Sequence, residues 1–170
     1  SMGTPVLEVL YFAEKIEDAD RRAILISREL AGYVSFDACM SYWQQHGWPE
    51  KQVWHDLIHR IAGLARNTHR HRIQLNSFSP GHVFVGEVDG VPDIRLIDRE
   101  GAKRRASIER AMLRDLDTFN RRSPGISLTD KLRFLLAYHQ QPRVNRRVRK
   151  TWKKLVTLYL KKNHNRAQPG

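Results

Sequence analysis

The sequence has little cysteine and no long apolar run, and these absences exclude several classes of protein. Cys39 is its single cysteine, so a disulfide framework is excluded, and the usage is typical of a reducing compartment. No segment approaches the roughly 18 consecutive apolar residues of a membrane-spanning helix. The sequence contains no common glycine-rich phosphate loop and no Cys-x-x-Cys pair. Its 170 residues and 41% hydrophobic content predict one globular domain.

Acidic residues are absent from the end of the chain, and this absence accounts for the net charge of +12. Residues 1–130 contain 18 basic and 18 acidic side chains, whereas residues 131–170 contain 12 basic side chains and none that is acidic. The asymmetry predicts a cationic end that faces an anionic partner: nucleic acid, a membrane surface or a phosphorylated glycolipid.

Apolar periodicity and turn signals predict an α+β chain that is mainly helical, with two pairs of short strands. Ala23–Ile26 form an apolar run typical of a buried strand. The expected strands are 5–16, 22–30, 82–88 and 94–98, the last two separated by a turn at 89–92; the expected helices are 36–45, 50–68, 107–120, 127–138 and 145–163.

Two features admit both a functional and a structural interpretation. Asp98 follows an apolar strand, where a carboxylate is a common Mg²⁺ ligand but also an ordinary turn residue. Arg70 and Arg72, with His69 and His71, form either a loop that faces a phosphate or a solvated helix end. For both features, the functional and the structural interpretation remain open from the sequence alone.

Five segments form an ordered series of motifs: 26–30 (ISREL), 71–85 (HRIQLNSFSPGHVFV), 97–99 (IDR), 114–116 (RDL) and 128–138 (LTDKLRFLLAY). Together they resemble the Kdo/WaaP superfamily of lipopolysaccharide kinases, most closely its InaA-like branch. The resemblance implies the large lobe of a protein-kinase-like fold with the small lobe mostly absent. It divides a single domain, 3–170, into remnant small-lobe strands and hinge at 3–30 and a helical large lobe at 31–170. Ser1–Met2 are interpreted as a cloning scar.

The resemblance also implies roles for individual residues. Ser77 stands where an active kinase has its catalytic Asp, with Asn76 beside it, and neither side chain can act as a carboxylate base. The glycine-rich loop and the ATP-anchoring Lys are not found in the sequence. The remaining roles are Mg²⁺ binding by Asp98 and His82, adenine contact by Glu29 and Ala31, and bracing of the catalytic loop by Asp115.

Three functions follow as hypotheses. The first is ATP- and Mg²⁺-dependent phosphate transfer to a lipopolysaccharide core sugar at the cytoplasmic membrane face, in a truncated or degenerate enzyme. The second is an inactive kinase-like module that binds anionic glycolipid, membrane or a partner through its basic end. The third, ranked last, is nucleic-acid binding through the final helix. The cations expected to face the partner are Arg146, Arg147, Arg149, Lys150, Lys153 and Lys154.

Overall fold

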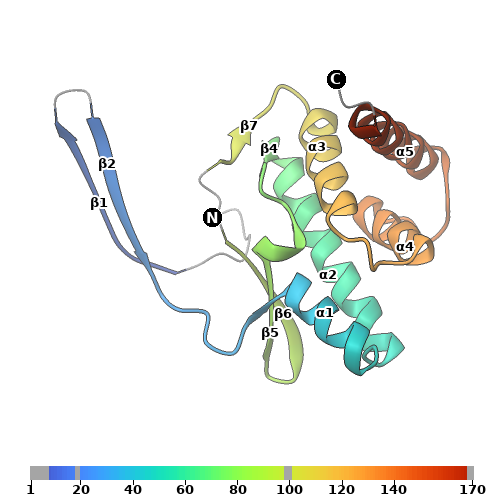
Figure 1. Ribbon diagram of the computed structural model, residues 1–170, viewed down its shortest axis with the longest axis horizontal. Coiled ribbons are helices and arrows are strands. Elements are labelled where there is room, and N and C mark those ends of the chain that lie inside the picture. The colour runs from blue at the N-terminus through green and yellow to red at the C-terminus, as the bar shows by residue number, and fades with distance from the viewer. Residues whose placement is uncertain (1–7, 18–19, 98–100, 168–170) are drawn as a thin grey trace.

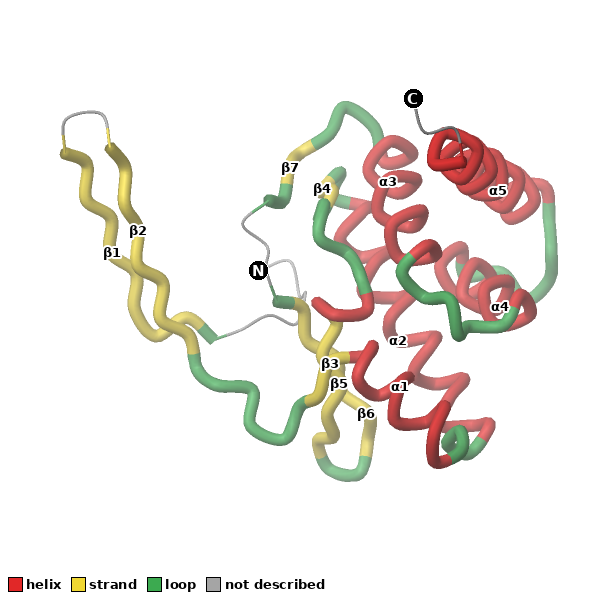
Figure 2. Tube along the Cα trace, in the orientation of Figure 1, coloured by secondary structure: helices red, strands yellow, loops and turns green. Residues whose placement is uncertain are grey.

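The computed structural model describes residues 8–17, 20–97 and 101–167, which form a helical body and small antiparallel sheets (Figures 1 and 2). The prediction of a mainly helical α+β fold with short strand pairs is confirmed. In chain order the elements are β1 Val9–Glu17, β2 Asp20–Ser27, β3 Val34–Ser35, α1 Phe36–His46, α2 Lys51–Arg70, β4 Ile73–Gln74, the 3₁₀ turn η1 Pro80–His82, β5 Val83–Val88, β6 Val91–Leu96, β7 Lys103–Arg104, α3 Ile108–Arg121, α4 Leu128–His139 and α5 Arg146–Ala167.

The β1–β2 hairpin stands away from the helical body (Figure 1). The predicted burial of Ala23–Ile26 is wrong, because Ile24, Leu25 and Ile26 are 50–59% exposed. An isolated pair of strands has no second layer to cover its faces, so even an apolar run stays in contact with water. Strand formation was therefore predictable here, whereas burial was not.

The second predicted strand pair is present as β5 and β6, and β3 extends it to a three-stranded sheet. The connecting turn is tighter than expected, since β6 begins at Val91 rather than at Ile94. Asp89 and Gly90 both have positive φ, 51° and 74°, as a two-residue type I′ turn requires. Pro92 fits because β6 lies at the edge of the sheet, where a missing N–H does not interrupt a ladder.

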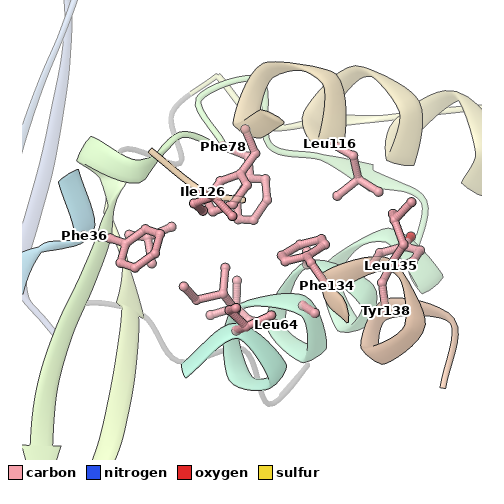
Figure 3. Packing of buried hydrophobic residues seen from close by; sticks show 14 of the residues in the cluster. Phe36, Leu64, Phe78, Leu116, Ile126, Phe134, Leu135 and Tyr138 are labelled. Atoms are coloured by element: carbon pink, nitrogen blue, oxygen red, sulfur yellow. The ribbon is translucent and has the colours of Figure 1, made fainter. Parts of the chain in front are cut away.

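Helix α2 runs through the centre of the body and packs on α3, α4, β4 and β6 (Figure 1). Its buried face includes Leu57, Ile58 and Ile61, as the spacing of three and four predicts. Aromatic side chains from separate elements complete the core: Phe36 is stacked on Phe119, with 6.2 Å between ring centroids. Figure 3 shows Phe36, Phe78 and Phe134 around the same interior.

The last helices begin close to the predicted positions because serine side chains cap them. The Ser107 hydroxyl accepts a hydrogen bond from the Arg110 amide at the start of α3, and Ser127 does the same for Asp130 in α4. Among the described residues, no helix combines the length and apolar character needed to cross a bilayer.

Candidate functional site

Residues 75–82 form a loop within segment 71–85, the segment that contains Ser77 and His82 of the implied catalytic loop. Leu75 and Phe78 anchor it, being 2% and 1% exposed, and the Phe78 ring stacks on Phe119 with centroids 4.8 Å apart. Ser77 and His82 are only half-buried. The loop therefore has an apolar underside fixed in the core and a polar side that remains accessible.

Asp115 of α3 holds the first part of this loop from inside the protein. The carboxylate is completely buried; its Oδ2 accepts a hydrogen bond from the Leu75 amide at 2.6 Å, and its Oδ1 accepts one from the Asn76 amide at 3.1 Å. These bonds fix Asn76 in a left-handed conformation with φ of 62°. This geometry agrees with the bracing role that the resemblance implies for Asp115.

Two further side chains extend the contact. The sequence places His69 in a basic segment that faces either a phosphate or solvent, and this is wrong for His69 because its ring is completely buried. The buried His69 ring lies between Asp115 Oδ2, 3.0 Å from Nε2, and the Tyr138 hydroxyl, 3.0 Å from Nδ1. Burial raises the pKa of Tyr138, so its hydroxyl remains protonated and can donate to the ring. The signal available in the sequence was weak: two polar residues on the otherwise apolar faces of α2 and α4.

His82 is oriented by the loop itself. Its Nδ1 lies 2.7 Å from the backbone carbonyl oxygen of Ser77. Because a carbonyl oxygen can only accept, Nδ1 carries the proton and the lone pair of the neutral ring is on Nε2. The backbone carbonyl of His82 also accepts a hydrogen bond from the Ile97 amide at 3.1 Å, which joins the loop to the end of β6. The structure thus brings Ser77, His82 and residue 97 together.

The predicted magnesium site rests on a residue that the structure does not describe. Asp98 lies outside the described residues, and among those described no three His, Cys, Asp or Glu side chains are grouped closely enough to hold a metal. His82 offers a nitrogen donor, whereas Mg²⁺ prefers oxygen. A fit to Mg²⁺ therefore depends on the Asp98 carboxylate, with His82 as a secondary contact.

Asn76 is engaged on both atoms of its side-chain amide. Its Oδ1 accepts from Gln74 Nε2, and its Nδ2 donates to the backbone carbonyl of Gly101. Gln74 is 1% exposed and accepts a hydrogen bond from Arg105 Nε at 2.7 Å. Asn76 is thus a link between the loop and the segment around Gly101, which the sequence analysis did not foresee.

The predicted adenine contacts, Glu29 and Ala31, are exposed residues of the connection between β2 and β3. This connection leads into β3, whose Ser35 pairs with Phe84 directly after the candidate loop. The start of α1 then contacts η1, and a Cβ atom on Gly81 would lie 3.2 Å from Asp37 Oδ2. The connection that contains Glu29 and Ala31 is therefore linked to the loop through β3 and α1.

Comparison with known proteins agrees with this arrangement. The model of the lipopolysaccharide kinase (Kdo/WaaP) family matches residues 1–138. The chain belongs to this family. A solved structure of WaaP in complex with acyl carrier protein is similar in fold, with a TM-score of 0.77 and 20% sequence identity over 96% of this chain and 70% of that chain. No curated protein sequence matches the chain.

In this lipopolysaccharide kinase family chain, the six α5 cations predicted to face a partner fall into two groups. Lys150 and Lys154 pair with Glu109 of α3, with Nζ–Oε1 distances of 3.6 and 2.6 Å. The single negative charge of Glu109 offsets one of these two positive charges, so the two lysines together present less net charge to a partner. The other predicted contacts have no acidic partner among the described residues and are exposed; they are Arg146, Arg147, Arg149 and Lys153.

The family chain also contains an apolar cavity of about 240 Å³ between α2, α3, α4 and α5. Phe36, Leu116 and Phe134 lie on its inner wall, and Lys131 and Tyr159 also line it. Burial lowers the pKa of Lys131. The cavity is lined by different residues from those of the candidate loop, with no member of 75–82 on its wall.

Proposed function

We propose that this lipopolysaccharide kinase family chain retains a kinase-like nucleotide centre with degenerate transfer chemistry. Asp98 and His82 would hold Mg²⁺, which would neutralise the charge of the ATP phosphates, and the hinge at Glu29 and Ala31 would contact adenine. Transfer to a lipopolysaccharide core sugar would be weak or absent, because the hydroxyl of Ser77 cannot accept the proton of an acceptor sugar as a carboxylate does.

The observation that supports this proposal is the loop conformation maintained by Asp115. Two backbone amides of the loop are bound by one buried carboxylate, so the positions of Ser77 and His82 are fixed independently of the side chain at position 77. The loop thus presents Ser77 and His82 on its accessible side, beside Ile97, which precedes Asp98 in the chain.

Nucleotide binding tests the proposal. Binding of ATP to the full chain, measured by titration calorimetry with and without Mg²⁺, should be strengthened by the metal, and Asp98→Ala should remove most of that gain. Asp56→Ala is a matched control, because Asp56 lies on α2 and its Oδ1 accepts a hydrogen bond only from Gln52. Absence of ATP binding in the wild-type chain, with or without Mg²⁺, would refute the nucleotide centre.

Substitution at position 77 tests the degenerate chemistry separately. Ser77→Asp restores a carboxylate while leaving the backbone carbonyl that binds His82 in place. A general base contributes on the order of 100-fold or more to a rate, so Ser77→Asp should raise ATP turnover at least tenfold, whereas Ser77→Ala should leave it unchanged. A large loss of turnover in Ser77→Ala would show that the serine itself is catalytic.

We propose a second function for the α5 surface: binding of an anionic partner at the inner membrane face. Its support is the exposed group Arg146, Arg149 and Lys153, which lies on one side of the helix by its spacing of three and four residues. The structurally similar WaaP was solved with acyl carrier protein, which makes a carrier protein one candidate besides anionic glycolipid.

Charge removal on α5 tests this second function. A triple Arg146→Gln, Arg149→Gln, Lys153→Gln variant should lose binding to acyl carrier protein or to vesicles of acidic lipid, and wild-type binding should weaken with salt. A Lys150→Gln, Lys154→Gln variant is the control, since both lysines already pair with Glu109. Equal losses in the two variants would contradict a specific surface, and preferential binding of duplex DNA with a steep salt dependence would favour the nucleic-acid hypothesis.

A further inference from the structure

A second cationic surface lies beside the candidate loop, on the β4–β7 strand pair. Pairing of Ile73 with Arg104 and of Gln74 with Lys103 brings together two basic segments that are 30 residues apart in the chain. No acidic residue occurs between positions 57 and 86 or between 101 and 108. Figure 1 shows β7 beside β4, close to the start of α3. The surface, called here the β4–β7 cluster, consists of Arg70, His71, Arg72, Lys103, Arg104 and Arg105.

Backbone geometry brings two of these arginines close together. The Arg105 amide donates a hydrogen bond to the Arg72 carbonyl at 2.8 Å, directly beside the pairing of Ile73 with Arg104. Arg72 itself lies outside β4, in a left-handed turn with φ of 61°. Like charges that are held close together repel each other, and a bound anion would relieve this repulsion.

Arg105 differs from the other cations of the cluster because it is held by a buried neutral group. Its Nε donates to Gln74 Oε1, Gln74 donates to Asn76, and Asn76 donates to Gly101. This chain of amides fixes the orientation of the guanidinium without neutralising its charge. Elsewhere the Nε atoms of Arg28, Arg95 and Arg121 are paired with carboxylates.

A fixed guanidinium that keeps its charge suits an oxyanion. Its planar donors match the paired oxygens of a carboxylate or a phosphate, and fixing one nitrogen in advance reduces the entropy lost on binding. The four lysines and arginines beside it in the cluster favour the doubly charged phosphate monoester over a singly charged carboxylate. A lysine cannot reproduce this geometry, because its ammonium is a point charge. The ligand is therefore expected to be a phosphate monoester rather than a neutral sugar.

We propose that Arg105, positioned by Gln74 and assisted by Arg72, forms a binding site for a phosphate monoester group. The site is linked to the candidate loop through Asn76, but it does not use Ser77, His82 or bound nucleotide. The inference thus goes beyond the proposed kinase-like centre and can hold even where that proposal fails. A phosphorylated saccharide and a phosphorylated lipid headgroup share the required chemistry.

The test is a binding titration of the full chain at constant ionic strength, in which the NMR chemical shifts of the protein report the affinity for each probe. Inorganic phosphate and glucose 6-phosphate are the soluble probes, glucose is the uncharged control, and vesicles with or without phosphatidic acid supply the headgroup. Arg105→Gln should weaken phosphate binding about tenfold and Arg105→Lys at least about threefold, as loss of a charge-assisted bidentate contact implies. Arg60→Gln, an equal charge change at an exposed position of α2, should change it less than about twofold.

The results distinguish a saccharide phosphate from a lipid headgroup as the ligand, and they also show whether the site exists. Binding of glucose 6-phosphate in an Arg105-dependent manner supports a saccharide, and Arg105-dependent binding of phosphatidic acid vesicles alone supports a lipid headgroup. Both uphold the site. Equal affinity in Arg105→Lys and the wild type, equal loss in Arg60→Gln and Arg105→Gln, or no binding of any phosphate probe by the wild type would overturn it. Circular dichroism of each variant confirms that the fold is retained.

Discussion

Replacement of Asp115 by alanine is expected to release the candidate loop and destabilise the whole domain. The carboxylate accepts three hydrogen bonds, from the amides of Leu75 and Asn76 and from the ring of His69. Alanine would leave the buried Leu75 and His69 donors and the partly buried Asn76 amide without this acceptor, and would also leave a cavity beside His69, which is completely buried.

The expected loss can be estimated from the three contacts. A hydrogen bond to a charged group contributes about 1.5–3 kcal/mol, but the contributions of neighbouring bonds are not additive. The desolvation of the carboxylate is also relieved when it is removed. We therefore expect Asp115→Ala to lower the free energy of unfolding by about 3–5 kcal/mol, a large fraction of the total for a domain of this size.

Urea unfolding followed by circular dichroism measures this loss. With a slope of about 2 kcal/mol per molar urea, the midpoint should fall by about 1.5–2.5 M. Asp56→Ala removes one exposed hydrogen bond, from Gln52, and should change the free energy of unfolding by less than about 0.5 kcal/mol. The reasoning fails if Asp115→Ala costs less than about 1 kcal/mol, or if the NMR amide resonances of Leu75 and Asn76 do not move in the folded variant.

Three other substitutions have defined outcomes. Gly86→Ala should lower the free energy of unfolding by about 1–3 kcal/mol in urea, because a Cβ atom there would lie 2.7 Å from the Tyr33 ring. Burial, with smaller effects from Arg147 and Arg66, lowers the pKa of His139 to about 4, against 6.5 for the unfolded chain. Between pH 6.5 and pH 4, His139 binds a proton in the unfolded chain but not in the folded one, so the free energy of unfolding should fall by up to about 3 kcal/mol as the pH is lowered over this range. Urea titrations at each pH should show that His139→Gln lacks this contribution to the pH dependence. Phe12→Ser on the exposed hairpin should leave the free energy of unfolding within about 0.5 kcal/mol and reduce binding of a hydrophobic dye.

Matched variants give each of these outcomes a reference. Gly63→Ala lies on exposed helix with nothing within 4 Å of the new Cβ, and should stabilise by about 0.5–1 kcal/mol. Phe36→Ala removes a core ring and should cost about 3–5 kcal/mol, in contrast to Phe12→Ser. If the stability of wild type and of His139→Gln changed with pH in the same way, burial of His139 would not be the cause of the pH dependence. If Phe12→Ser were as destabilising as Phe36→Ala, the hairpin would not be the exposed element described above.

The helices could be predicted from the sequence because their signals are local. Apolar residues recur at helical spacing in α2, and serines at 107 and 127 supply the caps that fix where α3 and α4 begin. The turn between β5 and β6 is at the predicted place, but it has two residues, Asp89 and Gly90, instead of the four predicted at 89–92. The positive φ of Asp89 depends on strand pairing in the hairpin and is not given by the residue type alone.

Contacts between distant segments were harder to predict. The β4–β7 pair has two residues in each strand, too few for an alternating pattern, and it forms because α3 and the loop bring Gln74 and Lys103 together. The contact of His69 with Tyr138 and Asp115 joins three helices that only the fold makes neighbours. The exposed hairpin is the reverse case: its apolar run indicates burial, but no layer of the described structure covers it.

The geometry of the loop explains how the residue at position 77 could change without loss of the fold. Its backbone is fixed from below, by Asp115 on two amides and by Phe78 in the core, while the His82 ring binds the carbonyl of Ser77 rather than its side chain. None of these contacts requires a carboxylate at position 77. The fold therefore depends on Asp115 but not on the side chain at position 77, so the degenerate chemistry that we propose for Ser77 requires no change in the loop conformation.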